Sequence, residues 1–178
     1  MAAEKGYAAS QANLGLMYVK GVGVGKDYRE GMEWLTKAAE QGSANGQCAL
    51  GWMYQRGYGV PINYDRARML YLKAVDGGGI QALTNLGLMY IYGLGVKKDC
   101  KEGMARLSQA ADRGNANAMG ALGRLYRVGT DVQKDYDRAL EWYRRAIDGA
   151  SAEAMSDLGI MYVEGLGVPK SYSSCQKF

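Results

Sequence analysis

The chain has 178 residues, a formal net charge of +4, a pI near 8.9 and no histidine. The absence of histidine excludes a histidine general base, a histidine-containing catalytic triad and the commonest metal ligand. Lysines and arginines are scattered among acids, and no apolar run reaches the roughly 18 residues of a membrane span, so neither a nucleic-acid site nor a transmembrane segment is expected.

The dipeptide Leu-Gly recurs five times at a constant interval of 36 residues, and a tyrosine follows three residues after each glycine. A fixed period in the range of 20–50 residues is typical of one supersecondary unit stacked on copies of itself. In chain order, the units are 7–42, 43–78, 79–114, 115–150 and a partial unit 151–178. Residues 1–6 are in register with the end of a unit, so we expect them to be the remnant of a preceding repeat in a single solenoid domain.

Each unit is predicted to be a short antiparallel pair of helices, as the unit 43–78 illustrates. Its first helix, helix A, follows the N-cap Ser43 and ends at Gly57, and its second, helix B, follows the N-cap Asn63 and closes at the C′ glycine Gly78. Gly51 inside helix A costs about 1 kcal/mol relative to alanine, so we expect it to permit a close helix–helix approach. The N-caps of the other units are Asp27, Asp99, Asn115, Asp135, Ser151 and Ser171.

Three local features depart from the simplest unit. Asp131 replaces the second glycine of the turn after helix A and is expected to adopt the left-handed conformation with slight strain. Ala150 stands where the other complete units have a C′ glycine. Glu30 and Glu102 lie three residues after their N-caps, which predicts a capping box. Repeated Leu, Met, Tyr and Trp columns are predicted to form the core.

The repeated pattern resembles the Sel-one-like repeat family, a relative of the tetratricopeptide repeats. The first unit matches it at Ala8, Leu14, Gly15, Tyr18, Gly21, Gly23, Val24, Asp27, Trp34, Ala38, Ala39 and Gly42. The resemblance covers essentially the whole chain and implies an all-α fold, a right-handed α/α superhelix (solenoid) of helix-turn-helix repeats. It also implies a protein-interaction scaffold, since family members act as adaptors in protein complexes, bacterial signalling and host–pathogen contact.

The chain departs from the family pattern at several positions. Leu70 and Arg106 replace the tryptophan of helix B, so those interfaces are expected to be less aromatic, and Phe178 falls in the same column of the partial unit. The chain also lacks the cysteine pair that some bacterial relatives carry in each repeat. Its three cysteines, Cys48, Cys100 and Cys175, are odd in number without C-x-x-C spacing, so we expect neither a metal site nor a cofactor.

One stripe of helix A varies between units while the core columns stay fixed. Its positions are spaced by 0, 4, 7 and 11 residues, which places them on one helical face, and by resemblance to tetratricopeptide repeats this face lines the concave groove. Asparagines suit an extended peptide backbone, aromatic rings suit apolar anchors, and arginines suit acidic groups. The candidate binding residues are Asn13, Asn45, Trp52, Arg56, Asn85, Tyr92, Asn117, Arg124 and Asp157. An ordinary solvent face or burial against the next repeat is the alternative.

Two other candidate sites are rejected. The glycine turn from Gly21 to Lys26 has the wrong spacing for a phosphate loop and recurs in every unit. The cap aspartates Asp27, Asp99 and Asp135 belong to different units, at multiples of the 36-residue period, and are therefore too far apart for a catalytic carboxylate dyad.

The favoured reading is therefore a non-enzymatic, monomeric module that binds a peptide or protein in its groove. The alternatives are a structural spacer in a longer array and, less favoured, a hydrolase that binds cell-wall or antibiotic ligands. Family prevalence implies a bacterial origin. Unpaired cysteines favour a reducing, cytoplasmic compartment, whereas an upstream signal peptide lost with the missing part would indicate a periplasmic or secreted protein.

Overall fold

A computed structural model describes residues 6–129 and 131–170, and this part of the chain forms nine α-helices and no strand. The expected all-α fold is thereby confirmed. The caps or columns assigned to residues 1–5, Ser171, Cys175 and Phe178 lie outside the described residues. The helices are α1 (Ala8–Lys20), α2 (Tyr28–Glu40), α3 (Ala44–Arg56), α4 (Tyr64–Asp76), α5 (Ile80–Tyr92), α6 (Cys100–Asp112), α7 (Ala116–Val128), α8 (Tyr136–Asp148) and α9 (Ala152–Glu164).

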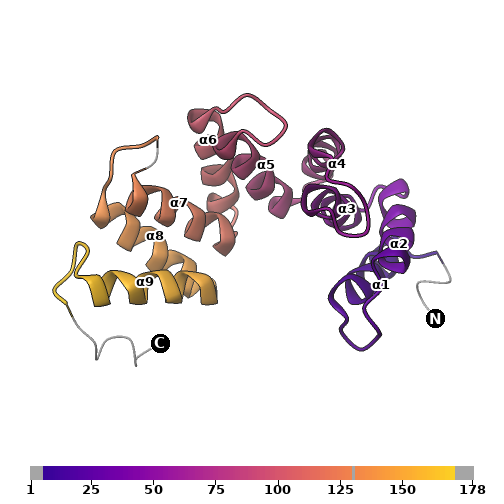
Figure 1. Cartoon of the computed structure of the whole chain (residues 1–178), viewed down its shortest axis with the longest axis horizontal. Coiled ribbons are helices and arrows are strands. Elements are labelled where there is room, and N and C mark those ends of the chain that lie inside the picture. The colour runs from indigo at the N-terminus through magenta and orange to yellow at the C-terminus, as the bar shows by residue number, and fades with distance from the viewer. Residues whose placement is uncertain (1–5, 130, 171–178) are drawn as a thin grey trace.

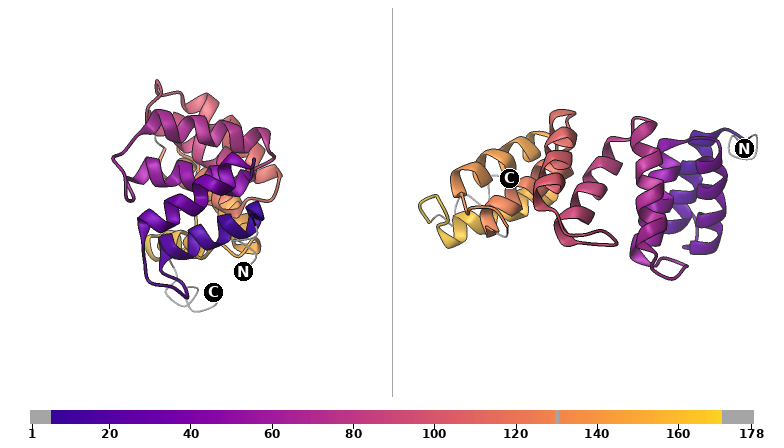
Figure 2. Two further views of the ribbon diagram at one scale, coloured as in Figure 1. Left: turned by 90° about the vertical axis from the view of Figure 1, so that its right-hand side faces the viewer. Right: turned by 90° about the horizontal axis from the view of Figure 1, so that it is seen from above.

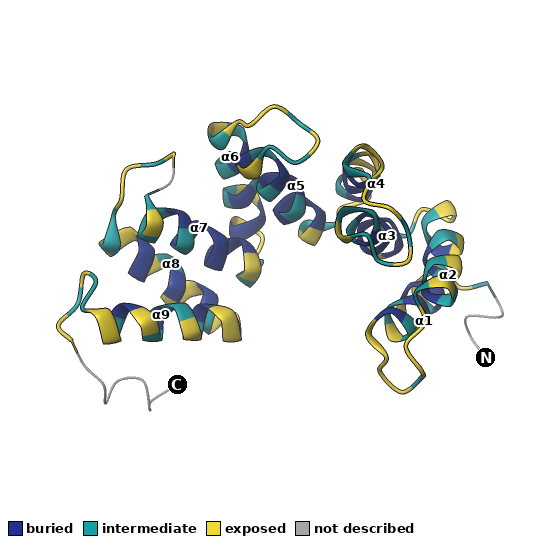
Figure 3. Cartoon of the chain, viewed as in Figure 1, coloured by how far each residue is buried: buried dark blue, intermediate teal, exposed yellow. Residues whose placement is uncertain are grey.

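The helices form stacked pairs along a curved array (Figure 1). Helices α1 and α2, α3 and α4, α5 and α6, and α7 and α8 pack as pairs, and each even-numbered helix packs on the odd-numbered helix that follows. Helices α1 and α9 lie at opposite ends of the long axis (Figure 2). Buried residues line the facing sides of the helices, while exposed residues concentrate in the turns and on the outer surfaces (Figure 3). None of the described helices is long and apolar enough to cross a membrane.

Side-chain caps set the start of most helices, as the sequence predicted. The Asp99 carboxylate accepts from the Glu102 N–H at 2.9 Å, and the Ser43 hydroxyl accepts from the Gly46 N–H at 3.2 Å. Such a cap contributes about 1 kcal/mol. The same bond is made by Asp27, Asn63, Asn115, Asp135 and Ser151.

The predicted capping box is only half formed. The backbone N–H of Asp99, which the box would leave for Glu102, instead donates to the Tyr90 carbonyl at 2.9 Å. The Glu102 carboxylate pairs with Arg106 at 2.8 Å. The chain reversal between helices A and B therefore satisfies the cap N–H itself, and the glutamate remains available for a helix-surface ion pair.

Positive φ angles occur where the sequence predicted them. Gly57 ends α3 at φ 71°, and Asp131 in the later turn lies at φ 60° with its carboxylate paired to Lys98. After α8, Ala150 adopts φ 62°, whereas Gly78 and Gly114 in the same column lie at 83° and 84°. The two non-glycine residues accept a conformation that costs an L-residue about 1–2 kcal/mol.

Close helix approach explains the glycine of the Leu-Gly dipeptide in the four complete units. A Cβ atom at Gly87 would lie 2.9 Å from the carbonyl oxygen of Gly103 and 2.9 Å from Cγ of Leu107. Equally tight contacts surround Gly15, Gly51 and Gly123. The close approach lets α5 and α6 pack backbone against backbone, which offsets the poor helix propensity of glycine.

The most buried column of helix B is not the tryptophan column. The large side chains of helix B that are completely buried stand one position later, at Leu35, Tyr71, Leu107 and Tyr143. Trp34 and Trp142 are only half-buried. The prediction that tryptophan forms the core was therefore partly wrong, because the pair geometry turns the neighbouring column toward helix A.

Candidate functional site

A groove of about 700 Å³ crosses the helix A side of the array between α3, α5, α7 and α9. We call it the A-helix groove. Its apolar floor is formed by Leu88, Ile91, Ala121 and Leu125, and its volume lies within the roughly 300–1,000 Å³ of typical ligand sites. Tyr92 is 59% exposed and Val128 is 49% exposed. Two apolar side chains thus stand open to solvent beside a hydrophobic floor.

A polar ladder links successive units across the groove. The Gln81 amide oxygen accepts from Asn115 and from Asn117, each at 3.2 Å, and the Gln81 amide nitrogen donates to Asn85 at 3.3 Å. Asn115 also accepts from the buried Thr84 hydroxyl at 3.2 Å. These bonds tie α5 to α7, so part of the amide capacity expected for a peptide backbone is used within the protein.

Asn85 extends the ladder to the preceding unit. Its amide nitrogen donates to the Cys48 sulfur at 3.6 Å. Burial raises the pKa of the Cys48 thiol to about 11, although the Asn85 contact opposes that shift. A neutral buried thiol is a poor nucleophile, so Cys48 serves packing in this position.

An ion network closes the α9 end of the groove. Arg124 contacts Glu153 at 2.9 Å and Asp157 at 3.3 Å, and Arg127 reaches Asp157 at 3.5 Å. Burial opposes the charge of Arg124, but the two carboxylates outweigh it and raise its pKa. Arg127 also donates to the Tyr143 hydroxyl at 3.2 Å. The network joins α7, α8 and α9 and stiffens this wall.

Two further charges reach the groove from turns. Lys98 and Asp131 form an ion pair between the turns of the third and fourth units. Neither residue was predicted to line a binding site, because all the predicted binding residues lie on the helix A stripe. Their columns follow helix A in successive units, and stacking at a 36-residue period brings such turns side by side.

The groove brings together five of the nine predicted binding residues. Arg56, Asn85, Tyr92, Asn117 and Arg124 line it. Of these, Arg56 is exposed and forms no ion pair with any described residue, whereas Arg124 already holds two carboxylates. A partner's acidic group would therefore meet a readily available cation at Arg56 and a competed one at Arg124.

The other four predicted residues lie elsewhere. Asn13 and Asn45 are exposed on α1 and at the start of α3, and Asp157 sits behind Arg124 in the ion network. Trp52 is half-buried and packs edge-on against Tyr58, with ring centroids 4.8 Å apart. Tyr58 in turn stacks on Tyr28 at 5.1 Å. Trp52 thus belongs to an aromatic cluster between the first two units.

No group of three or more His, Cys, Asp and Glu side chains is placed to hold a metal ion within the described residues. Apart from Arg56, the charged side chains that line the groove form ion pairs, Lys98 with Asp131 and Arg124 with Glu153. What the arrangement offers chemically is a rigid, mixed apolar and polar surface.

Comparison with known proteins gives a consistent relationship. The family model described as Sel1 repeat matches residues 8–43, 44–79, 80–115, 116–151 and 152–178. A search of curated proteins found no significant match.

Solved structures with the same architecture come from several bacteria. A Sel1 repeat protein from Oxalobacter formigenes is 36% identical with a TM-score of 0.79, over 99% of this chain and 72% of that one. The protective antigen c5321 of uropathogenic Escherichia coli, which has an SLR fold, is 38% identical with a TM-score of 0.74, over 98% of this chain and 38% of that one. The immunity protein Pa5087 from Pseudomonas aeruginosa is 28% identical with a TM-score of 0.69, over 97% of this chain and 63% of that one.

Proposed function

This chain belongs to the Sel1 repeat family, and we propose that it is a non-enzymatic scaffold that binds a protein or peptide partner in the A-helix groove. Sel1 repeat proteins commonly serve as protein-interaction scaffolds. A bacterial origin belongs to the same proposal and is supported by the bacterial sources of the similar structures, among them a protective antigen of a pathogenic strain.

The observation that carries the proposal is that Tyr92 and Arg56 both line the groove. Tyr92 is 59% exposed over the apolar floor, and Arg56 adds a cation that no described carboxylate pairs. Aromatic and arginine side chains of this kind are enriched among residues that dominate binding energy. An extended segment with an apolar side chain and a nearby carboxylate has the complementary chemistry.

A peptide-display selection tests the proposal. Peptides are selected on the immobilised chain from a random library, and their dissociation constants are then measured for the wild type and for the double variant Arg56→Ala, Tyr92→Ala. We expect the variant to weaken selected peptides by at least about tenfold, because two such contacts each contribute about 1 kcal/mol or more.

The matched control is Lys20→Ala with Glu164→Ala. These residues occupy the same helix A column as Arg56 and Tyr92, are also exposed, and do not line the groove. The control should leave affinities unchanged. Peptides that bind both double variants as tightly as the wild type would show that the groove is not the binding site.

The alternative function is a structural spacer within a longer repeat protein. One relative is much longer, since this chain spans only 38% of the E. coli antigen, and a spacer role is compatible with that difference in length. A spacer predicts that no selected peptide depends on groove residues. The same selection therefore separates the two functions.

A further inference from the structure

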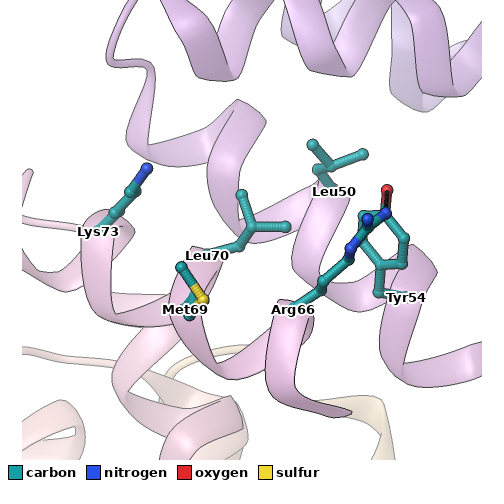
Figure 4. Close-up of a pocket in the computed structure, with 6 residues that line it drawn as sticks. All are labelled: Leu50, Tyr54, Arg66, Met69, Leu70 and Lys73. Carbon is teal, nitrogen blue, oxygen red and sulfur yellow. Dashed lines mark hydrogen bonds between the residues drawn. The ribbon is translucent and has the colours of Figure 1, made fainter. Parts of the chain in front are cut away.

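A second, smaller hollow lies between α3 and α4 in the second unit (Figure 4). It has a volume of about 230 Å³ and is lined by Leu50, Tyr54, Arg66, Met69, Leu70 and Lys73. Tyr54 and the groove residue Arg56 are two positions apart on α3, so their side chains point about 200° apart around the helix. The hollow therefore opens on a different face from the A-helix groove. It is smaller than typical ligand pockets of about 300 Å³ or more, which suits a single side chain.

The fourth unit has the same tyrosine and arginine beside this position. Arg138 lies 5.4 Å from the Tyr126 ring and donates to its hydroxyl at 3.4 Å. Arg66 repeats this arrangement on Tyr54, at 5.4 Å and 3.1 Å. The two frames match, but the column that holds Trp142 in the fourth unit holds Leu70 in the second. The hollow therefore lies at the column where the smaller Leu70 replaces the indole.

A lysine lines the hollow at the column that holds a cation in the first and fourth units. In the first unit Lys37 lies 4.4 Å from the centroid of the Trp34 ring, and in the fourth Arg145 lies 4.3 Å from that of Trp142. Lys73 occupies the same column in the second unit and lines the hollow, where Leu70 offers no ring. An ammonium group over an aromatic face is an attractive pairing that the second unit does not supply for itself.

The third unit also lacks the tryptophan, but a longer side chain takes its column. Its tryptophan column holds Arg106, whose guanidinium lies 5.2 Å from the Tyr90 ring and pairs with Glu102 at 2.8 Å. The chain thus covers the gap with its own side chain in the third unit and leaves it open in the second.

The rim of the hollow is also more apolar than in the fourth unit. Met69, which lines the hollow, is 56% exposed, whereas the same column holds Glu141 in the fourth unit. Methionine adapts its shape and makes favourable contacts between its sulfur and aromatic rings. Exposed apolar residues beside a hollow are typical of a contact surface.

We propose that this hollow receives an aromatic side chain, in the first place tryptophan, from a partner protein, which fills the column vacated at Leu70 and lies beneath the Lys73 ammonium. The site is independent of the A-helix groove. Its affinity for one side chain is modest, so it acts as an anchor point within a larger contact.

The test uses N-acetyl-tryptophanamide as the probe and follows methyl resonances of Met69, Leu50 and Leu70 by NMR. Saturable shifts confined to these methyls are expected at millimolar concentrations. Lys73→Gln should weaken binding about two- to fivefold, the contribution of an exposed cation–π contact. The matched control Lys37→Gln, in the same column of the first unit, should leave the binding constant unchanged.

Two further measurements make the proposal falsifiable. Leu70→Trp fills the hollow from within and should abolish the shifts, and N-acetyl-leucinamide should bind several-fold more weakly than the tryptophan derivative. Absence of saturable shifts in the wild type, undiminished binding to a folded Leu70→Trp variant, or equal binding of the leucine derivative would each overturn the proposal. The Lys73→Gln and leucine measurements decide the matter if the Leu70→Trp variant does not fold.

Discussion

Replacing Gly87 with alanine tests the close packing that holds each helix pair together. Alanine gains about 1 kcal/mol over glycine in a helix interior. Against this, the new Cβ would lie 2.9 Å from the Gly103 carbonyl oxygen and 2.9 Å from Leu107 Cγ. Because the first contact is with backbone, α5 and α6 must separate, and overpacking costs up to about 3 kcal/mol. The net expectation is a loss of about 1–2 kcal/mol.

The matched control is Gly120→Ala in α7. There the new Cβ would meet only the Ala154 Cβ, at an ordinary 3.9 Å, so the variant should be more stable than the wild type by about 0.5–1 kcal/mol. Urea unfolding followed by far-ultraviolet circular dichroism measures the free energy of unfolding of both variants. In thermal unfolding, a chain of this size shifts in Tm by about 2–4 °C per kcal/mol. The reasoning fails if Gly87→Ala is as stable as the wild type or if the two variants change stability in the same direction.

Three more predictions concern single residues. Ala150→Gly should raise the free energy of unfolding by about 0.5–1 kcal/mol, because glycine removes the strain of an alanine at a φ of 62°, partly offset by the greater unfolded-state entropy of glycine. Thermal unfolding measures the change, and a lower Tm for the variant would contradict the prediction. Asn115→Ala should lower the free energy of unfolding in urea by about 2–3 kcal/mol, and Ser43→Ala by about 1 kcal/mol, because Asn115 both caps α7 and accepts from the buried Thr84 hydroxyl. Equal losses in the two variants would show that the bond to Thr84 contributes nothing. Burial raises the Cys48 pKa from 9.0 to about 11. The stability contributed by the neutral thiol is therefore complete below pH 9 and is lost as the pH rises through 11, by about 3 kcal/mol at most. Cys48→Ala should flatten the fall in stability over that range, and an unchanged pH profile of the variant would contradict the prediction.

The fold was largely predictable because a fixed period makes one set of local rules apply five times. The caps at Ser43 and Asp99 and the left-handed Asp131 follow from backbone requirements that a few neighbouring residues determine. The half-formed capping box was not predictable, because the competing acceptor is the Tyr90 carbonyl, nine residues earlier in the chain. Local patterns cannot weigh a partner that only the helix pair supplies.

The candidate site was less predictable for a related reason. Periodicity places Trp52 and Arg56 on one stripe of α3, but the turn after α3 and its contact with the preceding unit decide what each side chain meets. Trp52 meets Tyr58 and is withdrawn into an aromatic cluster, whereas Arg56 remains exposed at the groove. Arg124 matched the predicted chemistry for acidic groups, yet Glu153 and Asp157 of this chain already use it.

Many polar side chains of the groove already bond to one another, and this affects how the proposed partner would be recognised. The ladder through Gln81 and the clamp at Arg124 fix the groove walls before anything binds, so binding pays less to order these side chains. The same bonds discourage a partner from replacing them, since each replacement trades one hydrogen bond for another at little net gain. Discrimination must then come from groups with unused capacity, which on this face are Tyr92 and Arg56 and on the α3–α4 face are Met69 and Lys73. Under the proposed function, recognition would be concentrated at the columns where one repeat differs from the next, while the columns that repeat hold the scaffold.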